Sequence, residues 1–266
     1  MTVSKELYMS PVDVAHKIEG EGPIVYFVHG IGSRKESWTP LVEVLKNEFT
    51  CVTFDLRGHG ESPTPPTPYN LDQLTSDLET LRLKLGHQHI NVVGHSLGGM
   101  IGPAYARAYP ASTHSLCLLS TAAGRSQEDR EKLSGVLAAL KNNGIAKTLD
   151  TLVDRWYTDE FRTKSPEAVQ ERLTDVMETP DNVFLSVFDV YASTEMGPWL
   201  HEVTCPSLVL TGEFDGGCNP RLNRFIANRL PNSQLTILEN LRHDILKEAP
   251  KRVANHLLKF LRQSVC

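Results

Sequence analysis

The sequence lacks several features that would assign it to a particular class of protein. No stretch of its 266 residues approaches about 18 uninterrupted apolar residues, so it predicts no membrane span. The first twenty residues lack the basic-then-apolar order of a secretory signal. There is no CxxC pair and no tight cluster of cysteine and histidine, and we therefore expect no metal site.

Cysteine is scarce, and basic charge is not in excess. The five cysteines are odd in number and far apart, which indicates reduced thiols in a cytoplasmic protein. With 27 Lys and Arg against 32 Asp and Glu, the net charge is −5, which argues against nucleic acids and anionic membranes as partners. We therefore expect a small molecule as the partner, and the sequence leaves homo-oligomerisation open.

Short apolar runs rich in β-branched residues recur along the chain and predict strands. They show no polar alternation, which is typical of strands covered on both faces in a parallel sheet. The runs are Ile24–Val28, Cys51–Phe54, Ile90–Val93, Leu116–Leu119, Leu208–Leu210 and Leu235–Leu238. Helical patterns lie between them, such as the leucines spaced by three and four from Leu71 to Leu85. This alternation predicts an α/β fold.

The alternation stops between residues 124 and 200, where only amphipathic helical patterns occur. These patterns cover Gln127–Lys141, Ile145–Tyr157, Pro166–Glu178 and Asn182–Ser193. A helical insertion in an α/β domain predicts a cap over a site. We therefore divide the chain into a first part of the core at 1–123, a helical cap at 124–200 and a second part of the core at 201–266.

The strongest chemical signal is Gly94-His95-Ser96-Leu97-Gly98, which fits the pattern G-x-S-x-G. It directly follows a predicted strand and opens a helix, the setting in which this pattern carries a nucleophilic serine. So sharp a turn strains the serine backbone, and the flanking glycines let neighbouring chain pass closely. Ser96 is therefore the candidate nucleophile.

A serine nucleophile needs a base, and the base needs an acid that orients it. His243 lies in the loop between the last strand and the last helix, which makes it the candidate base. The segment Thr211–Gly217, after the preceding strand, offers two acids. We prefer Asp215, which lies deeper in that loop before two glycines, and keep Glu213 as the alternative.

Two backbone N–H groups are candidates for stabilising the oxyanion of a tetrahedral intermediate. The N–H of Leu97 lies at a helix N-terminus, which favours negative charge. The N–H of Ile31 lies in His29-Gly30-Ile31-Gly32, a loop after a strand whose glycines permit close approach of the backbone. These two groups form the predicted oxyanion hole.

These motifs, with Asp55–Ser62 and Arg242-His243-Asp244, resemble the motif series of the α/β-hydrolase fold in order and spacing. The resemblance covers nearly the whole chain. It implies a mostly parallel sheet of eight strands flanked by helices, with the first strands in Leu7–Glu19. It also implies the catalytic triad Ser96, Asp215 and His243.

A narrower resemblance, to the 3-oxoadipate enol-lactonase group, rests on Leu118–Ala123, Arg155–Thr158 and Phe161. It implies hydrolysis of a small acidic enol-lactone. Because sites in open α/β sheets lie beyond the carboxyl ends of the strands, the cap should wall the substrate pocket. Substrate-binding candidates are Gly30 and His95 in the core, and Trp156, Tyr157, Phe184, Phe188, Tyr191, Met196 and Trp199 in the cap, with Arg155 for a substrate carboxylate.

The combined prediction is a serine hydrolase that cleaves an ester or lactone bond through an acyl-enzyme, without a metal or cofactor. A carbon–carbon bond hydrolase of a diketone would use the same triad, and the motifs do not separate it from the first reading. A non-catalytic small-molecule receptor is a third alternative, although an exposed, strained serine would serve no purpose there.

Overall fold

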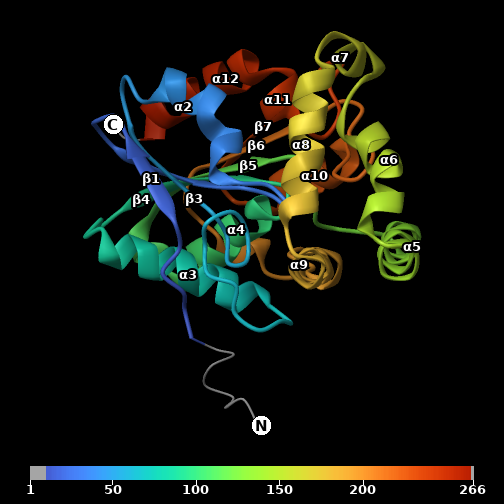
Figure 1. The fold of residues 1–266 in the computed structure, drawn as a ribbon. Helices are drawn as coiled ribbons and strands as arrows, with labels where there is room; N and C mark the ends of the chain where they lie inside the picture. Colours follow the sequence, from blue (N-terminus) through green and yellow to red (C-terminus); the bar gives the residue numbers. More distant parts are fainter. Residues whose placement is uncertain (1–9, 265–266) are drawn as a thin grey trace, which may run out of the picture.

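The computed structural model describes residues 10–264, and its framework is a sheet of seven strands (Figure 1). The strands are β1 (His16–Glu19), β2 (Ile24–Val28), β3 (Thr50–Phe54), β4 (Ile90–His95), β5 (Thr113–Leu119), β6 (Ser207–Gly212) and β7 (Ser233–Leu238). Their order across the sheet is β1-β3-β2-β4-β5-β6-β7. β1 is antiparallel to β3, and all other neighbours are parallel. The six apolar runs are thus confirmed as strands β2 to β7.

The expected count of eight strands is wrong for the described part of the chain. Within Leu7–Glu19 only β1 forms a strand, and residues 7–9 lie outside the described residues. Between residue 10 and β1, the N–H groups of Val12 and Ala15 donate to the side chains of Asp77 and Ser62, each at 2.9 Å. Backbone donors bonded to side chains in this way do not build a strand ladder.

Helices cover both faces of the sheet, and each face has its own apolar core. On one face lie α2 (Thr39–Leu45), α11 (Ile245–Glu248) and α12 (Pro250–Ser264), at the top of Figure 1. On the other lie α3 (Leu71–Lys84), α4 (Gly98–Ala108) and α10 (Pro220–Arg229). The central strands are buried from both sides, which explains their continuous apolar runs.

Five helices follow one another between β5 and β6, on the right of Figure 1. They are α5 (Gln127–Asn143), α6 (Ile145–Trp156), α7 (Asp159–Lys164), α8 (Pro166–Glu178) and α9 (Asp181–Ser193). The sequence analysis predicted four of these helices. It missed α7, which has only six residues and is capped by the side chain of Thr158. Apolar side chains of α5, α6, α8 and α9 form a third cluster, so these helices pack on one another.

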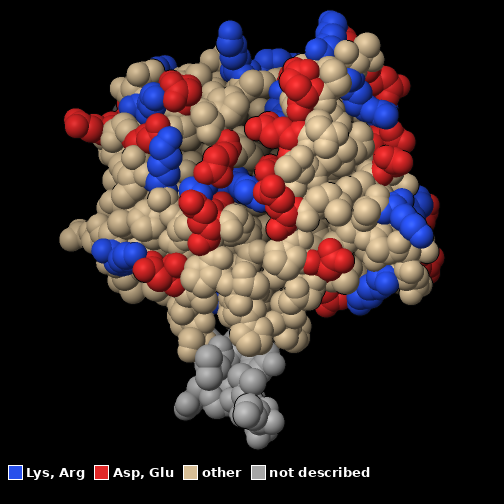
Figure 2. Space-filling view, viewed as in Figure 1, with Lys and Arg blue, Asp and Glu red and all other residues tan. Residues whose placement is uncertain are grey.

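Short 3-10 turns complete the described elements: η1 (Lys35–Trp38), η2 (Pro110–Ser112) and η3 (Leu200–Glu202). None of the helices in residues 10–264 is both long enough and apolar enough to span a bilayer. The cysteines at positions 51, 117, 205 and 218 are free thiols. On the face shown in Figure 2, acidic side chains surround basic ones near the middle, so charges of both signs are interspersed.

Candidate active site

Ser96 occupies a strained turn at the carboxyl end of β4, in the middle of the sheet. Its φ is +56°, in the left-handed region that side chains other than glycine rarely adopt. The turn depends on its glycines, because a Cβ on Gly94 would lie 2.1 Å from the carbonyl oxygen of Gly98. A Cβ on Gly98 would lie 2.0 Å from the carbonyl oxygen of Val28. This packing holds the strained serine in place.

His243 and Asp215 come from loops after two neighbouring strands. Asp215 follows β6, and His243 lies between β7 and α11. Nδ1 of His243 donates to Oδ2 of Asp215 at 2.7 Å. The other oxygen, Oδ1, accepts the N–H groups of Gly217 at 3.0 Å and Cys218 at 2.7 Å. The alternative acid, Glu213, is exposed and accepts the N–H of Asn240 at 3.1 Å instead.

Burial and mutual charge set the protonation of this pair. Burial disfavours the imidazolium, but the charge and hydrogen bond of Asp215 outweigh burial, so the pKa of His243 lies well above its usual value. Burial alone would raise the pKa of the Asp215 carboxyl. The charge of His243 and the backbone donors outweigh burial, so that pKa is lowered. The carboxylate is therefore suited to fix the tautomer and orientation of the ring.

One cavity of about 110 Å³ brings the three side chains together. Ser96, His243 and Asp215 all line it. Among the described residues no hydrogen bond joins Ser96 Oγ to His243, and both side chains border the same space. Apo geometry of this kind is common, because catalytic hydrogen bonds often tighten only when substrate is bound.

The predicted oxyanion donors lie beside this cavity. A Cβ on Gly30 would lie 3.1 Å from Cβ of Ser96, so the loop after β2 passes directly against the serine. The N–H groups of Ile31 and Leu97 have no acceptor within residues 10–264. Two unpaired amides next to a strained serine have the arrangement needed to bind a developing oxyanion.

Most of the predicted substrate-binding residues line the cavity. Gly30 and His95 do so from the core. Those from α6 and α9 are Arg155, Trp156, Phe184, Phe188 and Tyr191. The sequence analysis missed three further lining residues, because only the packing of their helices brings them to the cavity: Leu133 on α5, Arg172 on α8 and Lys247 on α11.

Tyr157, Trp199 and Met196 do not line the cavity and correct the prediction. Tyr157 is fully buried, and its hydroxyl donates to Asp244. Trp199 lies under the guanidinium of Arg107, 5.3 Å from the ring centroid, and packs on the core. Met196 is fully buried in the same core. Helical spacing indicates that an aromatic residue is buried, but it does not indicate which residues cover that side chain.

One group of side chains in the described residues has the spacing of metal ligands. Atoms of Asp215, Cys218 and His243 lie within 4.8 Å of one another. Both carboxylate oxygens of Asp215 are already bonded to donors, and the thiol of Cys218 pairs with the hydroxyl of Tyr191 at 3.2 Å. Of these contacts, the bond to Asp215 orients His243, and the expected absence of a metal or cofactor stays a prediction.

Several known proteins are similar to this chain in sequence and in fold. The chain is 25% identical over 221 residues to 3-oxoadipate enol-lactonase 2 of Acinetobacter baylyi, which covers 83% of this chain and 82% of that protein. The enol-lactonase structure from Burkholderia xenovorans LB400 matches with a TM-score of 0.88 at 24% identity, over 94% of this chain and 97% of that one. A malate-bound esterase structure from Thermogutta terrifontis matches with a TM-score of 0.86 at 27% identity, over 95% and 94%.

A family model supplies the decisive match. The model described as alpha/beta hydrolase fold matches residues 23–250, which is most of the chain. This range contains the loop after β2, the turn at Ser96 and the loops that carry Asp215 and His243. The chain therefore belongs to the α/β-hydrolase fold family.

Proposed function

We propose that this protein is a serine hydrolase that cleaves an ester or lactone bond of a small molecule. The observation that carries the proposal is the bond between His243 Nδ1 and Asp215 Oδ2, in a cavity that the strained Ser96 also lines. A hydroxyl, an imidazole and a buried carboxylate that share one cavity have the composition of a catalytic triad. Neither metal nor cofactor has a role in this chemistry.

The reaction proceeds through an acyl-enzyme. Nε2 of His243 takes the proton from Oγ of Ser96 as the oxygen attacks the carbonyl carbon. The N–H groups of Ile31 and Leu97 stabilise the oxyanion, and Asp215 stabilises the imidazolium. The imidazolium then protonates the leaving oxygen. A water molecule that gives its proton to His243 attacks the acyl carbon and frees Ser96.

The helices between β5 and β6 act as the cap of this site, and the chain divides at residues 124 and 200 into core, cap and core. The support is that these helices supply Trp156, Phe184 and Phe188 to the cavity that contains Ser96. The cap thereby excludes water and selects the substrate. We place the enzyme in the cytoplasm, in keeping with its free thiols.

A small substrate that carries a carboxylate fits the charge at the cavity. Arg155 lines the cavity and forms no ion pair with any carboxylate in the described part of the chain. Two of the similar proteins point the same way, since one is a 3-oxoadipate enol-lactonase and the other is an esterase with malate bound. A small acidic enol-lactone is therefore the substrate class to test first.

The test is ester and lactone hydrolysis by Ser96→Ala together with labelling by a fluorophosphonate. We expect a loss of roughly 10³-fold or more in kcat and no label in the variant. A loss of only a few-fold would contradict the proposal, and an unlabelled wild type would favour a receptor. A parallel panel of lactones, esters and diketones separates ester hydrolysis from carbon–carbon bond hydrolysis.

A further inference from the structure

Arg172, on α8, contacts the loop that carries the proposed oxyanion donor Ile31. We call residues 29–33 the oxyanion loop. The guanidinium donates to the carbonyl oxygen of Ile31 through Nη2 at 2.8 Å and to that of Gly32 through Nη1. Its carbon Cζ lies 4.7 Å from the ring centroid of Trp156, over the ring face. Arg172 is 9% exposed, so these contacts are largely screened from water.

Two peptide groups of the oxyanion loop are held at their polar atoms. In the Ile31–Gly32 peptide, the carbonyl bonds to Arg172 and the N–H donates to Nε2 of His59 at 3.1 Å. In the Gly30–Ile31 peptide, the carbonyl oxygen of Gly30 accepts hydrogen bonds from Nδ1 of His29 at 2.7 Å and from the N–H of Ser33 at 3.3 Å. A flip of either peptide would break these bonds.

The orientation of the Ile31 N–H follows from these bonds. In a planar trans peptide the N–H and C=O point in opposite directions. Fixing the Gly30 carbonyl toward His29 therefore turns the Ile31 N–H the other way, and that N–H is left without an acceptor within residues 10–264. The bonds of His29 and Ser33 lie within the loop itself, and the glycines on both sides of Ile31 impose little restriction on its backbone. The bonds that hold the loop from outside are those of Arg172 to the next two carbonyls and of His59 to the Gly32 N–H.

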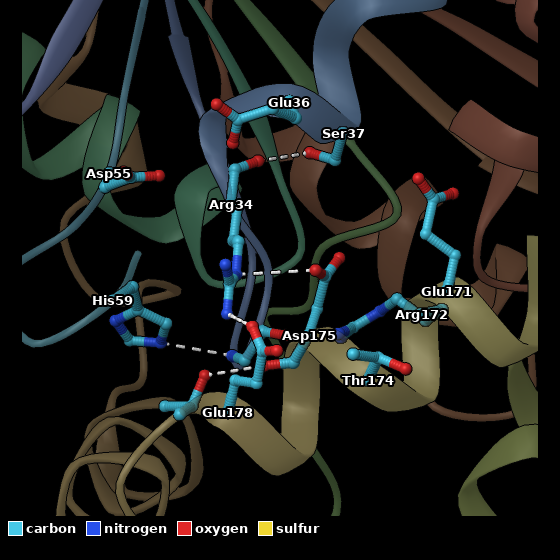
Figure 3. Close-up of polar contacts among 12 residues, drawn as sticks. Arg34, Glu36, Ser37, Asp55, His59, Glu171, Arg172, Thr174, Asp175 and Glu178 are labelled. Atoms are coloured by element: carbon cyan, nitrogen blue, oxygen red, sulfur yellow. Dashed lines mark hydrogen bonds and ion pairs between the residues drawn. The ribbon is translucent and has the colours of Figure 1, made fainter. Parts of the chain in front are cut away.

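Arg34, the residue that follows the oxyanion loop, forms a second, outer contact with α8 (Figure 3). It extends toward α8, where its Nε lies 3.4 Å from Oδ1 of Asp175 and its Nη2 pairs with Glu178. The side chain of Glu178 is 56% exposed, so that pair contributes little to stability. The buried bonds of Arg172 are therefore the stronger connection between α8 and the oxyanion loop.

We propose that Arg172 is a positioning residue that holds the oxyanion loop in the conformation in which the Ile31 N–H is free to bind the oxyanion. Docking of α8 and formation of the oxyanion hole then become one event, so the site is competent only when the cap is in place. This inference rests on the proposed function, because it assigns Arg172 an effect on a step at Ser96. It differs from a direct role in substrate binding, in which Arg172 would pair with a substrate carboxylate.

The experiment compares Arg172→Ala and Arg172→Lys with Arg162→Ala, an exposed arginine of the cap that pairs with Asp154. Each is assayed with p-nitrophenyl butyrate, which is neutral, and with a mono-p-nitrophenyl ester of a dicarboxylic acid. We expect Arg172→Ala to lower kcat about 10- to 100-fold for both esters, less than the ~10²–10³ for removing an oxyanion donor outright. KM should change little, Arg172→Lys should fall between, and Arg162→Ala should match wild type.

Chemical rescue adds a readout that a purely structural role would not give. Methylguanidinium should restore part of the kcat of Arg172→Ala by occupying the vacated space over Trp156, and methylammonium at equal ionic strength should not. The low-field proton resonance of His243 Nδ1–H should persist in the variant, which shows that the pair with Asp215 is intact. If Arg172→Ala does not fold, Arg172→Lys carries the kinetic test.

Two results would overturn the inference. One is a kcat in both Arg172 variants equal to that of wild type. The other is a defect confined to KM for the anionic ester, which would assign Arg172 to substrate binding. Ser96→Ala separates this failure from that of the proposed function. If Ser96→Ala stays active, the proposed function fails; if it is inactive while Arg172→Ala is fully active, the inference alone fails.

Discussion

The hydroxyl of Tyr157, at the end of α6, donates a hydrogen bond to Oδ2 of Asp244, the residue that follows His243. The N–H of Asp244 in turn donates to the carbonyl of Trp156 at 3.0 Å. Two bonds therefore tie the end of α6 to the loop that carries His243. Together with the contact between α8 and the oxyanion loop, they make two parts of the candidate site depend on helices inserted between β5 and β6.

Tyr157→Phe tests this dependence. The variant removes the hydroxyl that donates to the buried carboxylate of Asp244, and we expect the free energy of unfolding to fall by about 1–3 kcal/mol. The kcat should also fall, though by less than the ~10²-fold that misplacement of a reacting group can cause. Urea unfolding and steady-state kinetics measure both. Tyr109→Phe is the control, since its hydroxyl has no partner in the described residues, and equal effects of the two variants would contradict the argument.

The pH profile of kcat/KM reports on the pair of His243 and Asp215. Burial of His243 is outweighed by the Asp215 carboxylate, which raises the pKa of the imidazole well above 6.5. A protonated ring cannot accept the proton of Ser96, so activity should rise with pH through a midpoint above 6.5. Asp215→Asn should move this midpoint to lower pH and lower kcat. A wild-type midpoint at or below 6.5 would be inconsistent with the pair.

The candidate triad could be located from sequence because each member lies in a short motif next to a strand. Ser96 depends on a turn that only its neighbouring glycines permit, and a loop of two glycines marks Asp215. The carboxyl ends of parallel strands meet at one edge of the sheet, so local patterns were enough to predict their convergence. The same reasoning identified the N–H groups of Ile31 and Leu97.

The contribution of the helices between β5 and β6 to the cavity could not be predicted from sequence in this way. Arg172 carries no local sequence signal, since its position at the cavity depends on how α8 packs against the core. Tyr157 and Trp199 have the spacing of buried aromatic residues, but one faces Asp244 and the other Arg107. A helical pattern fixes which side of a helix is apolar and leaves open which neighbour covers it.

Arg155→Leu tests the expected preference for a substrate carboxylate. Arg155 lines the cavity without a carboxylate partner in residues 10–264, so an anionic substrate gains a charge-assisted hydrogen bond there. We expect KM for an anionic ester to rise about tenfold, in line with the ~1.5–3 kcal/mol of a hydrogen bond to a charged group. Hydrolysis of a neutral ester of similar size should not change. An equal loss with both esters would show that Arg155 supports the cap rather than the substrate.

Buried histidines should make the protein sensitive to acid. Burial lowers the pKa of His29 and of His95 to about 4, and burial with the neighbouring His29 lowers that of His59 to about 3. The unfolded chain binds these protons from pH 6.5 downward while the folded chain resists them. The raised pKa of His243 acts in the opposite direction, but three histidines with lowered pKa values outnumber it, so stability falls as pH drops from 6.5 toward 4. Urea unfolding at pH 7.5, 5.5 and 4.5 measures the slope. The exposed His89→Gln should keep that slope, and equal stability at all three values would refute the prediction.

Gly98 and Gly102 lie one turn apart on α4 and give a matched pair of substitutions. A Cβ at Gly98 would lie 2.0 Å from the carbonyl oxygen of Val28, in the strand beside β4, where the backbone has no room to move. A Cβ at Gly102 would meet only the side chains of Val92 and Leu116, at 3.5 and 3.6 Å, which are ordinary contacts. Gly98→Ala should therefore lower the free energy of unfolding by roughly 3 kcal/mol, the upper end of overpacking costs, and shift the turn at Ser96.

Gly102→Ala should instead keep activity and gain up to about 1 kcal/mol, because alanine favours a helix over glycine. Urea unfolding and fluorophosphonate labelling of Ser96 compare the two variants directly. Since both add a single methyl group to one helix, a difference between them measures the close approach of α4 to β2 rather than helix propensity. Two variants with equal stability would mean that the turn at Ser96 does not require glycine at position 98.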